Sequence, residues 1–161
     1  TQSFGEFNLP EGKSLLSIGS EVGFATENTV DTNNLRESLV ATAKKFLNVP
    51  FLWGGRSFFG IDDSGFVQLL YKVHGIALPR DPEQQALQGT ARDFVEESEA
   101  GDLAFFEDFE GKIVHVGLVL SPFEIIHASG KVRIDSLDFS GIYNAEQNKH
   151  THKLRFVKTM I

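Results

Sequence analysis

Apolar residues recur at helical spacing in the first half of the chain. One amphipathic helix is predicted over residues 35–47, with capping candidates at Asp31 and Thr32. It ends at Pro50, because the residue before a proline is driven out of the α region. A second apolar run, residues 66–73, predicts a buried helix that stops at Gly75. A short third helix should begin at Pro82.

After residue 100 the pattern changes to short apolar runs separated by glycine and proline. These runs predict antiparallel strands at residues 104–106, 112–120, 124–127, 131–134 and 154–157. A group of helices followed by a meander of strands indicates an α+β fold.

The first 30 residues carry turn formers between short apolar pieces, so we expect loops with one or two short strands. We interpret 1–30 as an N-terminal tail or linker packed on a single domain of residues 31–161, a size that suits one hydrophobic core. The chain does not begin with Met, so we expect that an upstream segment has been removed.

Composition and charge narrow the possible functions. A formal net charge of −7 argues against nucleic-acid binding, which favours a basic face. No apolar run approaches the roughly 20 residues that span a membrane. The chain contains no cysteine, which excludes disulfides, thiolate metal sites and thiol catalysis.

Candidate chemistry concentrates in residues 51–71, FLWGGRSFFGIDDSGFVQLLY. Asp62, Asp63 and Ser64 fall at the start of the second helix, where carboxylates and hydroxyls cap free N–H groups. A helix N-terminus also favours negative charge, and would therefore suit a nucleophile or an anionic intermediate.

This stretch resembles the NlpC-type cell-wall cysteine peptidases, whose signature is an aromatic-Leu-Trp-Gly-Gly segment followed by Gly-x-Asp-Cys-Ser-Gly-Phe. The matching residues here are 51–55 and 60–66, and Asp63 stands where the family has its nucleophilic cysteine. A Leu-Pro-Arg-Asp segment at residues 78–81, followed by Gln84-Gln85, continues the resemblance. It implies a papain-like α+β domain in which N-terminal helices pack on an antiparallel sheet of five or six strands, with no cofactor.

The resemblance also implies site residues. His115 matches the family's general base, and His127 matches the residue that orients it. Asp62 and Ser64 match positions that hold the free amine of the substrate, although helix capping alone would also explain both. We group Trp53, Arg56 and Gln85 with them as substrate-binding candidates; for Gln85, a solvated helix residue is an equal alternative.

The implied function is hydrolysis of peptidoglycan stem peptides, L-Ala-γ-D-Glu-diamino acid, by an exported protein in the periplasm or at the cell wall. Asp63 changes this expectation. A carboxylate is a weak nucleophile toward an amide, and beside His115 it forms an ion pair that removes the free base. We therefore expect little or no cysteine-peptidase turnover.

Three explanations for Asp63 remain open. The chain is a pseudoenzyme that still binds cell-wall fragments or a partner protein; or Asp63 is an introduced or recorded stand-in for cysteine; or the site has been repurposed. The repurposed form would be a metal-dependent hydrolase with Asp63, His115 and His127 as ligands. His150 and His152 form another His pair, which we interpret as part of a solvated tail rather than a metal site.

Overall fold

The computed structural model describes residues 4–9, 12–17 and 34–161. The first two segments are β1 (Phe4–Leu9) and β2 (Gly12–Ser17), which pair as an antiparallel hairpin. One or two short strands were expected in this region, and two are present. The assignment of residues 1–30 to a tail or linker stays a prediction. The capping candidates Asp31 and Thr32 lie outside the described residues.

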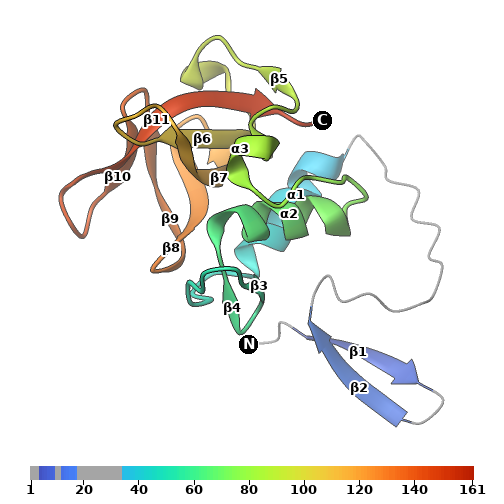
Figure 1. The fold of residues 1–161 in the computed structure, drawn as a ribbon. Coiled ribbons are helices and arrows are strands. Elements are labelled where there is room, and N and C mark those ends of the chain that lie inside the picture. Colours follow the sequence, from blue (N-terminus) through green and yellow to red (C-terminus); the bar gives the residue numbers. More distant parts are fainter. Residues whose placement is uncertain (1–3, 10–11, 18–33) are drawn as a thin grey trace.

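Three helices precede most of the strands (Figure 1). Helix α1 (Leu35–Lys44) begins after Asn34, ends three residues before the predicted end at residue 47, and buries Leu35, Leu39 and Ala43. Helix α2 (Asp63–Val73) ends at His74 and Gly75, whose φ of +81° suits a glycine that terminates a helix. Helix α3 is a single turn (Pro82–Gln85). A small hairpin of β3 (Arg56–Ser57) and β4 (Gly60–Ile61) leads into α2.

Six antiparallel strands form a closed barrel beside the helices. Their order around it is β10-β9-β8-β7-β6-β11, and β10 also pairs with β11. A two-residue strand, β5 (Thr90–Ala91), adds to the free edge of β11. The barrel strands are β6 (Leu103–Glu107), β7 (Ile113–Ser121), β8 (Glu124–Ser129), β9 (Lys131–Asp138), β10 (Gly141–Asn144) and β11 (Lys149–Thr159).

The α+β class and the antiparallel sheet are therefore confirmed, while two features of the C-terminal part differ from expectation. Strand β10 was not predicted. Strand β11 begins at Lys149, five residues before its predicted start, so His150 and His152 lie on a strand rather than in a tail. His150 is exposed as predicted, but His152 is half-buried. The first residues of β11 are mostly polar, and pairing with β10 holds them in a strand despite their weak apolar alternation.

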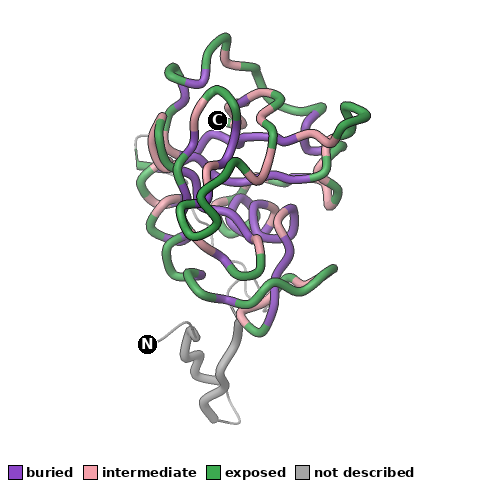
Figure 2. The backbone as a smooth tube through the Cα atoms, turned by 90° about the vertical axis from the view of Figure 1, so that its left-hand side faces the viewer, coloured by how far each residue is buried: buried purple, intermediate pink, exposed green. Residues whose placement is uncertain are grey.

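The core lies on both faces of β6, because its alternate residues point to opposite sides. Leu103 and Phe105 join the cluster between the sheet and the helices, and Ala104 and Phe106 join a second cluster on the other side of the strand. Figure 2 shows the buried segments in the middle of the molecule and the exposed segments in the loops around it. Helix α2 packs mainly on β7, which brings the start of α2 beside His115.

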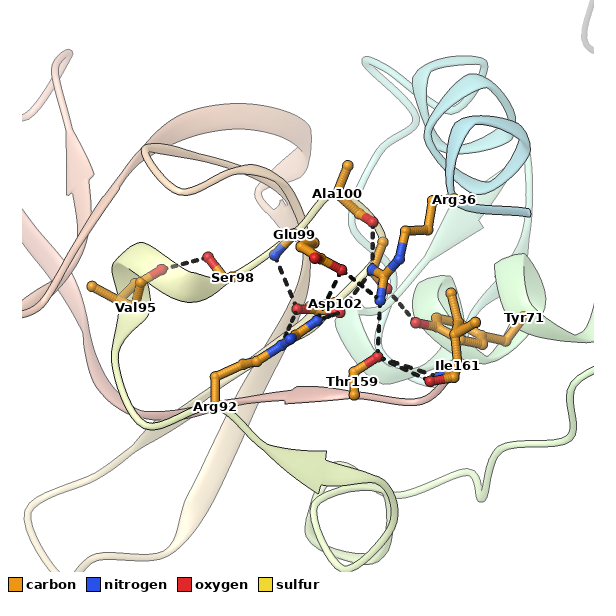
Figure 3. A network of polar contacts seen from close by, with 11 residues as sticks. Arg36, Tyr71, Arg92, Val95, Ser98, Glu99, Ala100, Asp102, Thr159 and Ile161 are labelled. Atoms are coloured by element: carbon orange, nitrogen blue, oxygen red, sulfur yellow. Dashed lines mark hydrogen bonds and ion pairs between the residues drawn. The ribbon is translucent and has the colours of Figure 1, made fainter. Parts of the chain in front are cut away.

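A buried ion network ties the helices to the barrel (Figure 3). The fully buried Asp102 carboxylate accepts bonds from Arg36 of α1 at 2.9 Å and from Arg92 at 2.9 Å. Arg36 also donates to Thr159 of β11, and the Tyr71 hydroxyl of α2 donates to the carbonyl of Gly101. The network therefore links both long helices to the strands against which the site is built.

Candidate active site

The start of α2 is held by the side chain of Asp62. One carboxylate oxygen accepts from the Gly65 N–H at 2.7 Å and the other from the Gly54 N–H at 2.8 Å, as the capping interpretation predicts. A Cβ on Gly65 would lie 2.6 Å from Asp62 Oδ1, so a glycine is needed for this close approach. The cap therefore fixes the position of the next residue, Asp63.

Asp63 faces the barrel rather than the solvent. Its Oδ2 lies 3.1 Å from His115 Nδ1 of β7 and accepts a bond from the Val116 N–H at 3.0 Å. The Asp63–His115 contact expected from the sequence is therefore present. Burial acts to raise the pKa of Asp63, but the hydrogen bond and charge of His115 outweigh it, so the pKa lies below its ordinary value.

A chain of hydrogen bonds continues from His115 into the barrel. His115 Nε2 lies 2.8 Å from His127 Nδ1, and His127 Nε2 lies 3.0 Å from Asp135 Oδ2. The Arg133 guanidinium donates hydrogen bonds to both carboxylate oxygens of Asp135, at 2.7 and 2.9 Å. The predicted pairing of His115 with His127 is thus observed, and Asp135 and Arg133 extend it.

The protons of this chain can be assigned from its partners, because an ionised carboxylate only accepts hydrogen bonds. His127 must donate its Nε2 proton to Asp135, so its Nδ1 accepts from His115. His115 then donates from Nε2 to His127 and from Nδ1 to Asp63. Both ring nitrogens of His115 are therefore occupied in this arrangement, Nε2 by His127 and Nδ1 by Asp63.

Burial keeps the neighbouring histidines neutral. It lowers the pKa of His127 to about 4, although the Asp135 carboxylate acts in the opposite direction. It also lowers the pKa of His152 to about 3, and the nearby His115 and His127 rings add to this shift. Two uncharged rings, His127 and His152, therefore lie beside His115.

A groove opens at Asp63 and has a volume of about 510 Å³. The start of α2 and the segment around α3 form two of its walls, and the beginning of β7 forms another. Acidic and basic side chains both reach it. Its lining residues are Trp53, Gly54, Asp62, Asp63, Ser64, Arg80, Asp81, Pro82, Glu83, Gln84, Lys112, Ile113 and Val114. Trp53 is 87% exposed at the rim, where a planar side chain can cover a bound ligand.

Arg80 was overlooked in the sequence, although it lies within the Leu-Pro-Arg-Asp segment. Its guanidinium donates to Ser64 Oγ at 2.7 Å and forms an ion pair with Asp62. The two side chains expected to hold a substrate amine are therefore already bonded to a cation of the chain itself. The amine-binding role of Asp62 and Ser64 stays a prediction.

Two other substrate-binding candidates do not line the groove. Arg56 is exposed on β3 and is absent from the groove walls. Gln85 is fully buried, and its amide nitrogen donates to the carbonyls of Ser64 at 3.0 Å and Pro79 at 2.8 Å. Gln85 therefore links the start of α2 to the α3 segment, and the solvated alternative was wrong. The substrate-binding role of Arg56 and Gln85 stays a prediction.

The metal set considered from the sequence does not form in this arrangement. Asp63 and His127 bond to opposite ring nitrogens of His115, so one ion cannot be shared by all three. The structure instead brings His152 to the site, where its ring stacks on His115 at a centroid distance of 4.2 Å. His150 remains exposed and bonds to Asp138 at 2.8 Å.

Comparison with known proteins gives consistent matches. The model of the NlpC/P60 family matches residues 48–154. The γ-D-glutamyl-L-lysine dipeptidyl-peptidase of Bacillus cereus is 37% identical over 123 residues, 74% of this chain and 36% of that protein. Its namesake from Bacillus subtilis is 40% identical over 94 residues, 57% of this chain and 31% of that protein. The chain thus spans about a third of the length of these curated relatives.

Solved structures agree with this assignment. An NlpC/P60 family protein from Bacillus cereus superposes with a TM-score of 0.72 at 28% identity, covering 99% of this chain and 51% of that one. The NlpC/p60 domain of the peptidoglycan hydrolase SagA superposes with a TM-score of 0.62 at 28% identity, covering 78% of this chain and 98% of that one. No helix among the described residues is long and apolar enough to cross a membrane. With its fold, the family match and these relatives in agreement, the chain belongs to the NlpC/P60 family.

Proposed function

We propose that this chain is an exported cell-wall domain that binds peptidoglycan stem peptides of the type L-Ala-γ-D-Glu-diamino acid, and that Asp63 occupies the position of the family's nucleophile and abolishes hydrolysis. The observation that carries the proposal is the contact of Asp63 with His115 at the edge of the groove. The nucleophile position and the base position are joined there by an ion pair.

The relatives support the choice of ligand. Two are named γ-D-glutamyl-L-lysine dipeptidyl-peptidases, and SagA is named a peptidoglycan hydrolase. The groove also suits the chemistry of such a peptide, which carries both an amine and carboxylates. The groove is lined by two basic residues, Arg80 and Lys112, and by two acidic residues, Asp81 and Glu83. It can therefore form ion pairs with both positive and negative groups of the ligand.

The chemistry of the site supports the loss of hydrolysis. A carboxylate attacking an amide would form an anhydride while expelling an amine, and His115 would have to accept and return the proton. His115 already donates from both ring nitrogens, so no base is available. RipD from Mycobacterium tuberculosis is described as a non-catalytic NlpC/p60 domain adapted to peptidoglycan binding. At 21% identity and a TM-score of 0.61, covering 79% of this chain and 98% of that one, this likeness concerns the fold alone.

Calorimetric titration with L-Ala-γ-D-Glu-L-Lys and with its diaminopimelate counterpart tests the binding claim. We expect saturable binding to the unmodified chain, with a Kd between about 1 μM and 1 mM, the range in which enzyme KM values usually lie. The titration is done in chelator so that any metal effect is excluded.

A matched pair of variants assigns the binding to the groove. Trp53→Ala should weaken binding about tenfold, because an aromatic side chain at the rim loses its contact with the ligand. Phe139→Ala removes another exposed aromatic ring that lies outside the groove, and should leave the Kd unchanged. Absence of binding by either peptide, or an equal effect of the two substitutions, would count against the proposal.

A further inference from the structure

Three imidazoles meet where the barrel adjoins the site. His115 comes from β7, His127 from β8 and His152 from β11, and one ring nitrogen of each lies within 4.8 Å of the others. All three stand on strands of the closed barrel, so their backbones are held by the ladder of hydrogen bonds. The hydrolysis chemistry considered above involves only the first two.

One nitrogen of each ring contacts a carboxylate or hydroxyl group outside the cluster of three imidazoles. His115 Nδ1 contacts the Asp63 carboxylate at 3.1 Å, and His127 Nε2 contacts the Asp135 carboxylate at 3.0 Å. His152 Nδ1 lies 2.9 Å from Thr151 Oγ1. The remaining nitrogens are therefore Nε2 of His115, Nδ1 of His127 and Nε2 of His152.

This arrangement has the form of a metal site with its supporting shell. A histidine that binds zinc almost always donates its other ring N–H to a carboxylate, a carbonyl or water, which fixes its tautomer and orientation. Two of the three rings here have a carboxylate in that place. We propose that His115, His127 and His152 bind one zinc ion, with Asp63 and Asp135 as the carboxylates that orient the first two ligands.

The adjustment that binding requires is small. Zinc–nitrogen bonds of about 2.0–2.1 Å in a tetrahedron place ligand nitrogens about 3.3 Å apart. His115 Nε2 and His127 Nδ1 now lie 2.8 Å apart, so this pair opens by about half an ångström and releases the proton between them. His152 must tilt out of its stack with His115, and a second cavity of about 490 Å³, which it lines, gives the ring space to move.

The fourth coordination position would be open to ligands. This second cavity adjoins the cluster, and His152, Phe106 and Val114 are among its lining residues. Three histidines and one exchangeable position are the pattern of catalytic zinc sites, in contrast to the four closed ligands of structural ones. Water or a ligand carboxylate entering from this cavity would complete the coordination.

Titration of the chelator-treated chain with Zn²⁺ by calorimetry, and with Co²⁺ by visible absorption, tests the site without any peptide. We expect one ion per chain and the intense d–d bands of tetrahedral Co²⁺. His152→Phe keeps an aromatic ring for the stack but removes the ligand, and should weaken Zn²⁺ binding at least about 100-fold. Asp135→Asn should weaken it about 10- to 100-fold by loosening His127.

His150→Phe is the matched control, because it removes an exposed imidazole from the same strand and should leave Zn²⁺ binding within about twofold. Circular dichroism verifies that each variant is folded. A chain that binds no Zn²⁺, or a folded His152→Phe variant that binds it as tightly as the unmodified chain, would overturn the inference. Neither result would affect the proposed binding of stem peptides, which is measured in chelator.

Discussion

Replacing Asp102 by Asn tests how the helices are held on the barrel. The Asp102 side chain is fully buried, and its carboxylate accepts from Arg36 and Arg92 at 2.9 Å each and from the Glu99 N–H at 3.0 Å. Asparagine has nearly the same shape, but its amide nitrogen would face one of these donors. The substitution therefore removes a charge and places two donors against each other at one position.

The expected cost follows from the burial of the network. Breaking a buried ion pair by neutralising one partner costs about 3–5 kcal/mol, because the other charge stays desolvated. The Arg36 and Arg92 side chains remain 29% and 23% exposed, so water can partly solvate them after the change. We therefore expect a loss near the lower end, about 3 kcal/mol of unfolding free energy, and a Tm lower by roughly 6–12 °C for a domain of this size.

Urea and thermal unfolding, followed by circular dichroism at pH 7, measure this loss. The control is Glu83→Gln, which breaks a surface pair with Lys112 in which both side chains are more than half exposed, and should cost less than about 1 kcal/mol. A loss for Asp102→Asn no larger than that of the control would refute the claim that this network holds the helices.

The same comparison has a definite pH dependence. Burial acts to raise the pKa of Asp102, but its bonds from the Glu99 N–H and from Arg92 and Arg36 outweigh it, so the folded-state pKa lies below the ordinary value. Its stabilisation is complete above the unfolded pKa, near pH 4, and is lost as pH falls through the folded pKa. The difference between the unmodified chain and Asp102→Asn should accordingly shrink below about pH 4.

Two further predictions concern the site itself. Gly117→Ala should lower the free energy of unfolding in urea by about 1–3 kcal/mol, because the new Cβ would lie 2.7 Å from Ile125 Cδ1 and 2.9 Å from His127 Cβ. An unchanged unfolding midpoint would show that these side chains can move to accommodate the methyl group. Asp63→Asn should remove part of the acid sensitivity of stability, since the lowered pKa of Asp63 gives stabilisation that is present above about pH 4 and lost below it. Identical pH profiles for the two chains would contradict the ion pair with His115.

Much of the fold could be predicted because its patterns are local. The helices α1 and α2 carry strong 3.6-residue spacing, and the glycine after α2 marks its end. Strands β6 to β8 have apolar runs bounded by turn residues. Strand β10 could not be found in this way because it is only four residues long, and the start of β11 could not because its residues are largely polar and are held by pairing with β10.

In the site too, residues within short motifs could be predicted, and residues brought in by strand pairing could not. A compact motif at a helix start contains Asp62, Asp63 and Ser64. The resemblance to the family also pointed to His115 and His127. Asp135 and Arg133 reach His127 only because β9 pairs with β8 in this register, with Arg133 opposite His127. The alternation of polar and apolar residues over Lys131–Asp135 was an available signal that Arg133 and Asp135 share one face of the strand.

His152 and Arg80 are harder cases. His152 is 37 residues from His115 along the chain and reaches it through the closure of the barrel, which no local pattern reveals. Arg80 was visible within a recognised segment, but only the packing of the α3 segment on the start of α2 shows that it binds Asp62 and Ser64.

A mass-spectrometric comparison of the unmodified chain with Asp63→Cys tests whether Asp63 is what abolishes hydrolysis at this site. Both are incubated in chelator with L-Ala-γ-D-Glu-L-Lys and with L-Ala-γ-D-Glu-diaminopimelate. We expect no cleavage by the unmodified chain and hydrolysis of the γ-D-glutamyl bond by Asp63→Cys at a rate roughly 10⁴-fold higher or more, because the nucleophile is restored opposite His115. Cleavage by the unmodified chain, or a folded Asp63→Cys variant that binds both peptides and cleaves neither, would contradict this expectation.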